Sequence, residues 1–435
     1  MYVADSRAST PSAQGAVRQA PAGRRRHAVA PTVLALGTVS LVTDVSSEMV
    51  TAVLPLYLVA GLGLSPLGFG LLDGIYNGFS ALVRLAGGHL ADRGGGRHKW
   101  VAGLGYGVSA LCKPLLLLAH TLTPIGLILA ADRTGKGLRT APRDALISLS
   151  STSETRGRAF GVHRAMDTAG ALLGPLLAFL ILRATVDGYD AVFTVSFCVA
   201  VTGVLVLVLF VPSGTTGRPA APDATDPPHR APAGGEPRPT LRAALGLLRR
   251  RALRRITVCA LLLGLATVSD SFVYLLLQRR LGVPDRWFAL LPLGTAAAFL
   301  VLAVPLGRLA DRVGRWRIFL AGHGALLLAY GLLLTSWHGT ALPYAVLALH
   351  GGFYAATDGV LMAAASDGVP EALRSSGLAV VQTGQAMARF ACSLLFGAAW
   401  TVWGDRTALA AATVALALCA AVSYSLRPTT LEPVS

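Results

Sequence analysis

Two acidic residues stand inside an apolar run near the start of the chain, where charge is rare and usually functional. Asp44 and Glu48 are four residues apart, so a helix places both carboxylates on one face. In a medium of low dielectric constant, two such carboxylates cannot both be ionised cheaply. One of them should therefore hold a proton unless a cation lies nearby, and the pair could take up and release protons.

A second group of charges lies in 132–144, directly after the apolar run 124–131. The segment carries four basic and two acidic side chains, and Arg133 projects away from the face that most of the others share. The shared face consists of Asp132, Lys136, Arg139 and Arg143. An acidic residue four positions before a basic one favours a helical ion pair, which predicts a pair between Asp132 and Lys136.

The elements that position these charges are helices in a membrane. Of the 435 residues, 53% are hydrophobic and 14% are charged, whereas a soluble domain carries about 25% charged residues. Apolar runs of about 20 residues, long enough to cross a bilayer, recur along the chain. The sequence therefore predicts an all-α membrane protein with twelve spans, at 31–60, 67–91, 100–120, 123–144, 159–183, 190–211, 256–279, 287–309, 317–337, 342–366, 376–402 and 407–426. Pro142 is expected to end the fourth span.

The net charge of +16 could suggest a nucleic-acid partner, but its placement indicates a membrane topology instead. Most lysines and arginines fall in alternate connections, which predicts that both termini are cytoplasmic. The five cysteines lie in apolar runs without CxxC spacing and are interpreted as packing residues. We expect the following division: a disordered cytoplasmic tail at 1–30, a six-helix half at 31–211, a cytoplasmic linker at 212–255, a second six-helix half at 256–427 and a tail at 428–435. An N-terminal signal peptide is the less favoured interpretation of the first segment.

An internal repeat supports two similar halves. Gly88-His-Leu-Ala-Asp92-Arg93 recurs as Gly307-Arg-Leu-Ala-Asp311-Arg312, each time after the second span of a half. With Arg97 and Arg315, these loops resemble the loop signature of the major facilitator superfamily of secondary transporters, although the first copy has one extra glycine. A plain positive-inside loop is the alternative. The resemblance extends over nearly all of the chain apart from the tails and the linker.

Two further segments resemble the same superfamily. Arg133 and Gly137 match its span-four pattern, with Lys136 in place of a glutamine and Arg139 in place of a glycine. The glycines and proline of span five resemble the motif of drug–proton antiporters, although its closing glycine pair is absent; they are Gly161, Gly170, Gly174 and Pro175. Ordinary close helix packing would explain span five equally well, in an importer as much as in an exporter.

The resemblance implies that spans one and four line a central cavity. We therefore expect Asp44 and Glu48, together or singly, to carry a coupling proton, with Arg133 beside them tuning its release. A static ion pair is the alternative. Candidate substrate contacts are Tyr57, Asn77, Lys136, Asp167, Asp270, Asp358, Gln382, Gln385 and Arg389. A cytoplasmic gate is expected to involve the two repeated loops together with Arg139, Arg143 and Asp144.

These patterns predict a proton-coupled secondary transporter of the cell membrane that exports a small molecule by alternating access. The alternatives are a proton-coupled importer of a nutrient or metallophore, and a transporter-like receptor or assembly factor without flux. No Walker A, HExxH or GxSxG pattern occurs, so neither ATP-driven transport nor enzymatic activity is expected. The expected partners are lipid, protons and a small substrate, with no cofactor, metal or nucleic acid, and the chain is expected to be a monomer.

Overall fold

The computed structural model describes residues 30–93, 98–152, 155–186, 188–212, 246, 249, 251–336, 339–358, 360–367 and 374–426. Within these ranges, the side chains at 80–82, 84–93, 141, 252, 281, 363, 364, 366, 367 and 374–379 are outside the description. Apart from residue 30, the two predicted tails fall beyond the described residues, and so does most of the predicted linker.

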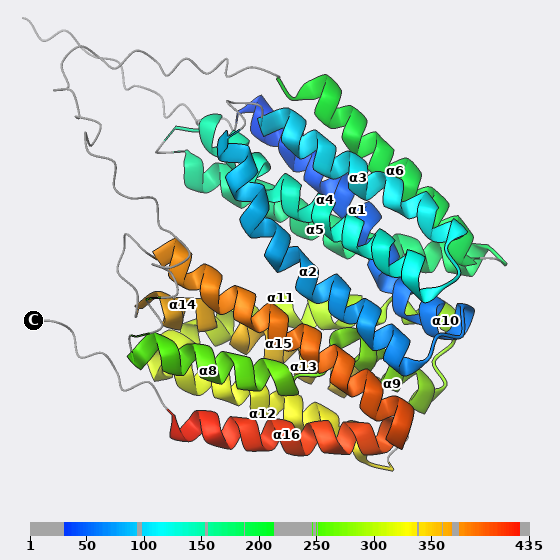
Figure 1. Cartoon of the computed structure of the whole chain (residues 1–435), viewed down its shortest axis with the longest axis vertical. Helices are drawn as coiled ribbons and strands as arrows, with labels where there is room; N and C mark the ends of the chain where they lie inside the picture. The colour runs from blue at the N-terminus through cyan, green and yellow to red at the C-terminus, as the bar shows by residue number, and fades with distance from the viewer. Residues whose placement is uncertain are drawn as a thin grey trace, which may run out of the picture.

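The first half of the chain folds into six long helices (Figure 1). They are α1 (Pro31–Leu56), α2 (Pro66–Arg93), α3 (His98–Leu118), α4 (Leu122–Leu149), α5 (Arg156–Ala184) and α6 (Gly188–Phe210), and a π-helical turn, η1 (Tyr57–Gly61), extends α1. α1 packs against α5 and α6, and α4 lies between α2 and α3. The charged segment 132–144 therefore lies inside the bundle.

The second half contains more helical pieces, because two of its spans are interrupted and a short helix, Asp285–Phe288, precedes a third. Its helices are α8 (Arg251–Ala266), α9 (Asp270–Leu281), α10 (Asp285–Phe288), α11 (Leu291–Val313), α12 (Arg315–Leu334), α13 (Leu342–Thr357), α14 (Val360–Asp367), α15 (Arg374–Trp403) and α16 (Asp405–Ser425). α8 with α9 forms one span, and α13 with α14 forms another. Within the described residues, the chain crosses the bundle twelve times.

Ten helical stretches of the described chain are long and apolar enough to cross a membrane. The two remaining spans are α2 and α4, and α4 carries the charged residues of 132–144. Large apolar side chains face outward on many helices; Leu118 and Val301, for example, are 77% and 73% exposed. An outer surface of this kind is suited to lipid rather than water.

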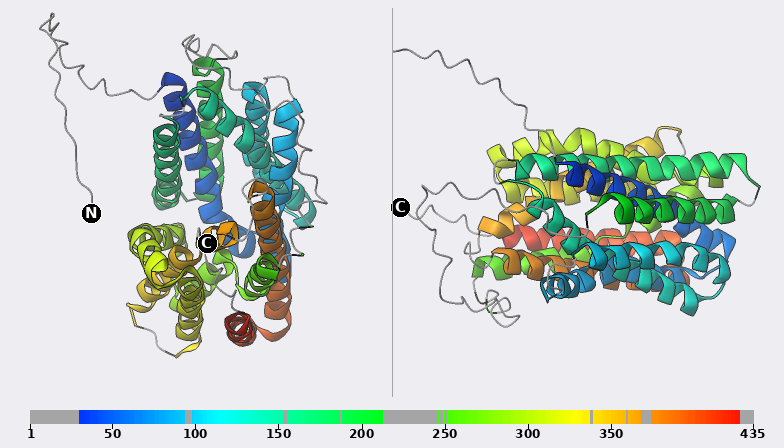
Figure 2. Two further views of the ribbon diagram at one scale, coloured as in Figure 1. Left: turned by 90° about the vertical axis from the view of Figure 1, so that its left-hand side faces the viewer. Right: turned by 90° about the horizontal axis from the view of Figure 1, so that it is seen from above.

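The two halves touch along a limited set of helices. α2 packs against α15, α5 against α10 and α11, and α1 against α9 and α10. In Figure 1 the halves meet near η1, α9 and α10 and diverge toward the end that carries α14, and Figure 2 shows the same two groups of helices from the side. We call the end near η1 the closed end.

Glycines permit the close approach of α2 and α15. Gly70, Gly74 and Gly78 recur every four residues on α2 and face α15. A Cβ atom on Gly70 would lie 2.4 Å from the carbonyl oxygen of Ser393, and one on Gly397 would lie 2.5 Å from that of Pro66. The two halves can therefore pack this closely only because these positions have no side chain.

The predicted spans 256–279 and 342–366 each occur as one membrane-crossing stretch, Leu253–Arg280 and Leu342–Met362. The helix breaks between α8 and α9 in the first and after Thr357 in the second. One predicted feature of the spans is wrong. Pro142 does not end α4, which continues to Leu149. A proline removes only one helical hydrogen bond, and the surrounding helices of a membrane bundle hold the backbone in place.

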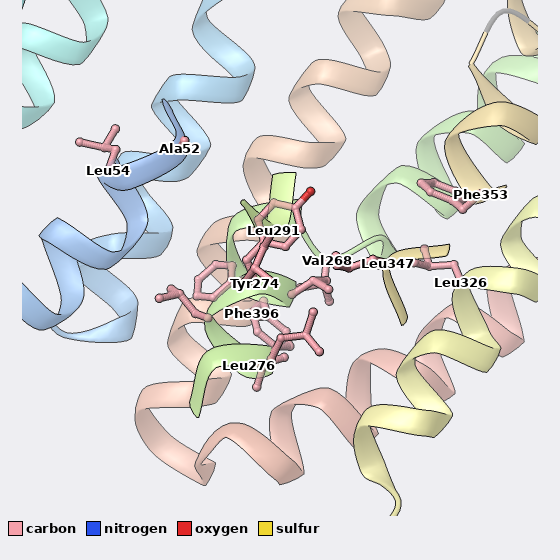
Figure 3. Close-up of a cluster of buried hydrophobic side chains, with 14 of the residues drawn as sticks. Ala52, Leu54, Val268, Tyr274, Leu276, Leu291, Leu326, Leu347, Phe353 and Phe396 are labelled. Carbon is pink, nitrogen blue, oxygen red and sulfur yellow. The ribbon is translucent and has the colours of Figure 1, made fainter. Parts of the chain in front are cut away.

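Apolar side chains fill the second half around α9. Figure 3 shows Val268, Tyr274 and Leu276 lying close to Leu291 and Phe396 from neighbouring helices. All five are 6% exposed or less. This packing fixes the position of the break before α9, which borders the cavity described next.

Candidate substrate cavity and its charged network

A cavity of about 380 Å³ lies between the two halves. The first half contributes Glu48, Thr51, Ala52, Pro55, Tyr76 and Asn77. The second half contributes Thr267, Val268, Ser269, Asp270, Ser271, Tyr274, Phe288, Pro292, Thr295, Ala296, Phe299, Tyr354, Asp358 and Arg389. Both interrupted spans supply residues at their breaks, so the wall combines apolar rings with polar and charged groups, as small-molecule sites do.

Glu48 is the acidic residue that the first half presents to this cavity. Lys136 Nζ lies 3.8 Å from Glu48 Oε1, and both side chains are about one third exposed. Nearby, the hydroxyl groups of Thr51 and Tyr76 are hydrogen-bonded. Glu48 therefore lies at the edge of the cavity, and the Lys136 ammonium group is the cation next to it.

Arg133 belongs to a buried cluster on α4 rather than to the Asp44 and Glu48 pair. Its Nη2 and Nε donate to Asp132 Oδ2 at 2.5 and 3.1 Å. Lys113 Nζ donates to Asp132 Oδ1 at 2.7 Å, and the Arg133 guanidinium lies 3.8 Å from the ring centroid of Tyr76. The predicted pair between Asp132 and Lys136 is absent from the described residues, because Asp132 pairs with Lys113 and Arg133, and Lys136 with Glu48.

Asp44 pairs instead with Arg139. Arg139 Nη2 lies 3.1 Å from Asp44 Oδ1, its side chain is 3% exposed, and its guanidinium stacks over Tyr106 at 4.5 Å. The partner of Asp44 is thus six residues further along α4 than the one predicted. The printed contacts of Arg139 lie within the first half, and its role in a gate stays a prediction.

Asp167 lies beside Asp44, where α5 packs on α1. A Cβ on Gly170, one helical turn along α5 from Asp167, would lie 3.2 Å from Asp44 Cβ, so this face of α5 packs directly on the acidic face of α1. Arg143 Nη1 lies 3.7 Å from Asp167 Oδ1 and donates to Ser40 Oγ, while Arg143 Nε donates to Asp144 at 3.1 Å. Asp167 is therefore part of the charged network of the first half, and it does not line the cavity.

The second half holds a polar cluster that the sequence analysis missed in part. Tyr354 donates to Asp270 Oδ1 at 2.5 Å, and His350 Nε2 lies 3.4 Å from the same oxygen. His350 is completely buried, and Thr295 Oγ1, which accepts a hydrogen bond from Tyr274, lies 3.5 Å from its Nδ1. An ionisable residue within an apolar run is itself a signal of function, and this signal could have identified His350.

A second missed contact joins the halves at the closed end. Ser393 Oγ on α15 donates to Asp73 Oδ2 on α2 at 2.7 Å, and both residues are buried. Closer to the end of the bundle, the backbone N–H of Leu67 donates to Thr401 Oγ1 at 3.0 Å. Asp73 was visible as an intramembrane acid, but its partner lies more than 300 positions away.

The remaining predicted cavity residues divide into three groups. Asn77, Asp358 and Arg389 line the cavity, and Gln385 lines a smaller space of about 50 Å³ that shares Asp358 and Arg389. Gln382 lines neither space. Tyr57 was wrongly predicted there: it is 6% exposed and packs against Tyr189 and Phe193, because the π-helical turn directs it into the first half.

The glycines of span five contact α1 at two positions. A Cβ on Gly170 would lie 2.5 Å from the carbonyl oxygen of Leu41, and one on Gly174 would lie 2.7 Å from Glu48 Cβ. A Cβ on Gly161 would meet nothing within 4 Å. Pro175 is buried within α5. This close packing places α5, with Asp167, against the acidic face of α1.

The repeated loops are described only in part. Gly88, Asp92 and Arg93 lie on α2 without described side chains, and Arg97 falls outside the described residues. In the second copy, Arg315 Nη2 lies 3.5 Å from Asp311 Oδ1 and links the end of α11 to the start of α12. Gly307 and Arg312 lie on α11. Their role in a gate stays a prediction.

Two six-helix halves enclosing a central cavity define the class of a helical membrane transporter. The Major Facilitator Superfamily model matches residues 36–393, and the chain belongs to this family. It is 28% identical over 394 residues to an uncharacterised MFS-type transporter of Methanocaldococcus jannaschii, covering 88% of this chain and 92% of that one. An uncharacterised protein of Mycobacterium tuberculosis is 34% identical over 157 residues, which is 36% of this chain and 38% of that protein.

Solved structures agree on the fold. The nucleoside transporter NupG matches with a TM-score of 0.75 and 12% identity, over 91% of this chain and 98% of that one. An inward-facing, occupied bacterial homologue of the human lysosomal transporter Spinster matches with a TM-score of 0.69 and 16% identity, over 92% and 98% of the two chains. At these identities the likeness concerns the fold alone.

Proposed function

We propose that the protein is a proton-coupled secondary transporter of the plasma membrane, with both termini cytoplasmic, that exports a small molecule by alternating access. The two halves rock about the central cavity, which opens first to one side and then to the other. Export is supported by the resemblance of the span-five glycines to those of drug–proton antiporters. The cytoplasmic placement of the termini is supported by the distribution of lysine and arginine.

The carboxyl pair Asp44 and Asp167 carries the proposal of proton coupling. Two carboxyl groups where α5 packs closely on α1 are costly to ionise together in a medium of low dielectric constant, so one of them is expected to hold a proton unless a cation neutralises it. Arg139 neutralises Asp44 at 3.1 Å, whereas the cations nearest to Asp167 are 3.7 Å away. Asp167 is therefore the group that gains and loses the proton. Glu48, paired with Lys136 at the cavity edge, connects this site to the substrate.

Transport into inside-out proteoliposomes tests the proposal. An acidic lumen should drive accumulation of radiolabelled benzyltrimethylammonium or of radiolabelled phenylacetate, a cationic and an anionic probe, and a protonophore should abolish it. Asp167→Asn should reduce the pH-driven component at least tenfold, because an asparagine amide can neither take up nor release the coupling proton. This variant keeps the Asp44 and Arg139 pair, and Arg143 retains Asp144, so the fold should persist.

Asp190→Asn is the matched control, since Asp190 is an exposed acid at the start of α6. It should transport like the unmodified protein. Accumulation that ignores the pH gradient, or an Asp167→Asn protein with an unchanged response to it, would contradict proton coupling at this pair.

A further inference from the structure

Asp270 presents an unused carboxylate oxygen beside the cavity. It occupies the first turn of α9, immediately after the break in the span, and its side chain is 40% exposed. Oδ1 accepts the hydrogen bond from Tyr354 and lies near His350, whereas Oδ2 has no hydrogen-bond partner among the described residues. A carboxylate held in this way has one oxygen left for a ligand.

The charge around the cavity favours a cationic ligand. Three carboxylates line it, and one guanidinium, that of Arg389, opposes them. Glu48 has Lys136 nearby, but no lysine or arginine in the described chain lies within 4 Å of Asp270 or Asp358. The N-terminus of a broken helix would ordinarily attract an anionic ligand. At the start of α9, the carboxylate of Asp270 occupies that position in place of such a ligand.

Aromatic rings complete the surroundings of Asp270. Tyr274, Phe288, Phe299 and Tyr354 line the same cavity. The faces of such rings attract cations, and the attraction increases where water is excluded. A carboxylate next to several rings is a suitable site for an organic ammonium group with an apolar body.

We propose that Asp270 is the cation subsite of this cavity, that the substrate is a small organic cation, and that a proton on His350 competes with it for the same carboxylate. The proposal rests on the transport function proposed above and adds the substrate class to it. A protonated His350, 3.4 Å from Asp270 Oδ1, neutralises the carboxylate from behind. Substrate and proton therefore bind in alternation at this site.

His350 is buried, so a proton on it acts only on the groups in direct contact with it. The groups that face it come from three helices: Asp270 and Tyr274 on α9, Thr295 on α11 and Tyr354 on α13. α12 contributes His323, whose ring packs against Phe353, and α15 contributes Arg389 to the cavity wall beside Tyr354. Asp270 is the one anion within 4 Å of His350 in the described chain, so the charge of His350 acts mainly on it.

Equilibrium binding to the purified full chain in detergent tests the proposal without any transport. The probe is radiolabelled benzyltrimethylammonium, whose charge does not change with pH. At pH 8 it should bind, phenylacetate should not compete, and Asp270→Asn should weaken binding at least tenfold. Asp358→Asn is the matched control, because it removes another cavity carboxylate that has no described hydrogen bond to His350, and it should weaken binding less.

The pH dependence tests the role of His350. Binding to the unmodified protein should weaken as the pH falls from 8 to 5.5, and His350→Gln should remove that dependence while preserving binding at pH 8. If His350→Gln does not fold, His350→Asn is the substitute. The proposal is overturned if the unmodified protein does not bind the cation or binds phenylacetate more strongly. It is also overturned if Asp358→Asn loses binding while Asp270→Asn does not, or if the pH dependence is unchanged without His350. Because binding is measured without a gradient, a negative transport result leaves this outcome unaffected.

Discussion

Arg133 makes two contacts that no other cation could make together. Its guanidinium donates two hydrogen bonds to Asp132 and stacks on the ring of Tyr76, which contributes to the cavity wall. Lys113 supplies a second positive charge to the same carboxylate. The cluster is buried, so its hydrogen bonds must be satisfied for the charges to be tolerated. It therefore fixes the position of Tyr76 at the cavity.

Arg133→Lys should lower thermal stability and weaken transport. Lysine keeps the charge but provides neither the paired hydrogen bonds nor the flat stacking surface, and the expected loss is about 1–3 kcal/mol. Thermal unfolding of the purified protein, followed by a thiol-reactive dye, measures it. Arg143→Lys should be milder, because Arg143 is more exposed and its contacts to Asp144 and Asp167 are longer. The reverse order would show that the cluster of Arg133 is dispensable.

At the scale of the elements, the breaks in two spans determine which acidic side chains line the cavity. α9 begins at Asp270 and α13 ends before Asp358, so both acids lie where the backbone leaves the helix. In a membrane, irregular backbone is tolerated only where it is buried in protein or lines a cavity. Here both breaks line the same cavity, which is consistent with a binding role.

The crossing of α2 and α15 sets how closely the halves can approach. Gly70→Ala should destabilise the present arrangement by about 1–3 kcal/mol, because the added Cβ would lie 2.4 Å from a backbone oxygen of α15. The melting temperature in detergent should fall accordingly. Gly107→Ala on α3 is the matched control, since its Cβ would meet nothing within 4 Å. Equal melting temperatures for the two variants would mean that the crossing is looser than described.

For the whole molecule, the contacts between the halves lie toward one end, which leaves the other end free to move. The Asp73 and Ser393 hydrogen bond, the Leu67 and Thr401 hydrogen bond and the glycine crossing all join α2 to α15. In alternating access these contacts must break when the substrate crosses. They should therefore be formed in one state of the cycle and absent in the other.

A disulfide across the closed end should stop transport. Leu67→Cys combined with Thr401→Cys places two thiols where the backbone N–H of Leu67 already donates to Thr401 Oγ1 at 3.0 Å. Oxidation should block uptake of the cationic probe into proteoliposomes, and a reducing agent should restore it. The Thr401→Cys single variant is the control for the five native cysteines, which are all free. Unimpaired uptake by the fully cross-linked protein would exclude opening at this end.

The sequence by itself determined the membrane class, the twelve spans, the two halves and the family. These follow from properties read along the chain: apolar run length, the clustering of positive charges in alternate connections, and a repeated loop. It also identified Glu48, Asn77, Asp270, Asp358 and Arg389, which line the cavity, because charge or polarity within an apolar run is conspicuous.

Only the tertiary structure decided which side chains meet. Periodicity tells which face of α4 a residue occupies, but the partner depends on how neighbouring helices are rotated and how deep each residue lies. For this reason Arg133 contacts Asp132 and Tyr76, whereas Arg139 contacts Asp44. The pair of Asp270 and His350 needed a broken helix to bring it together, and a break of this kind results from packing against the rest of the bundle.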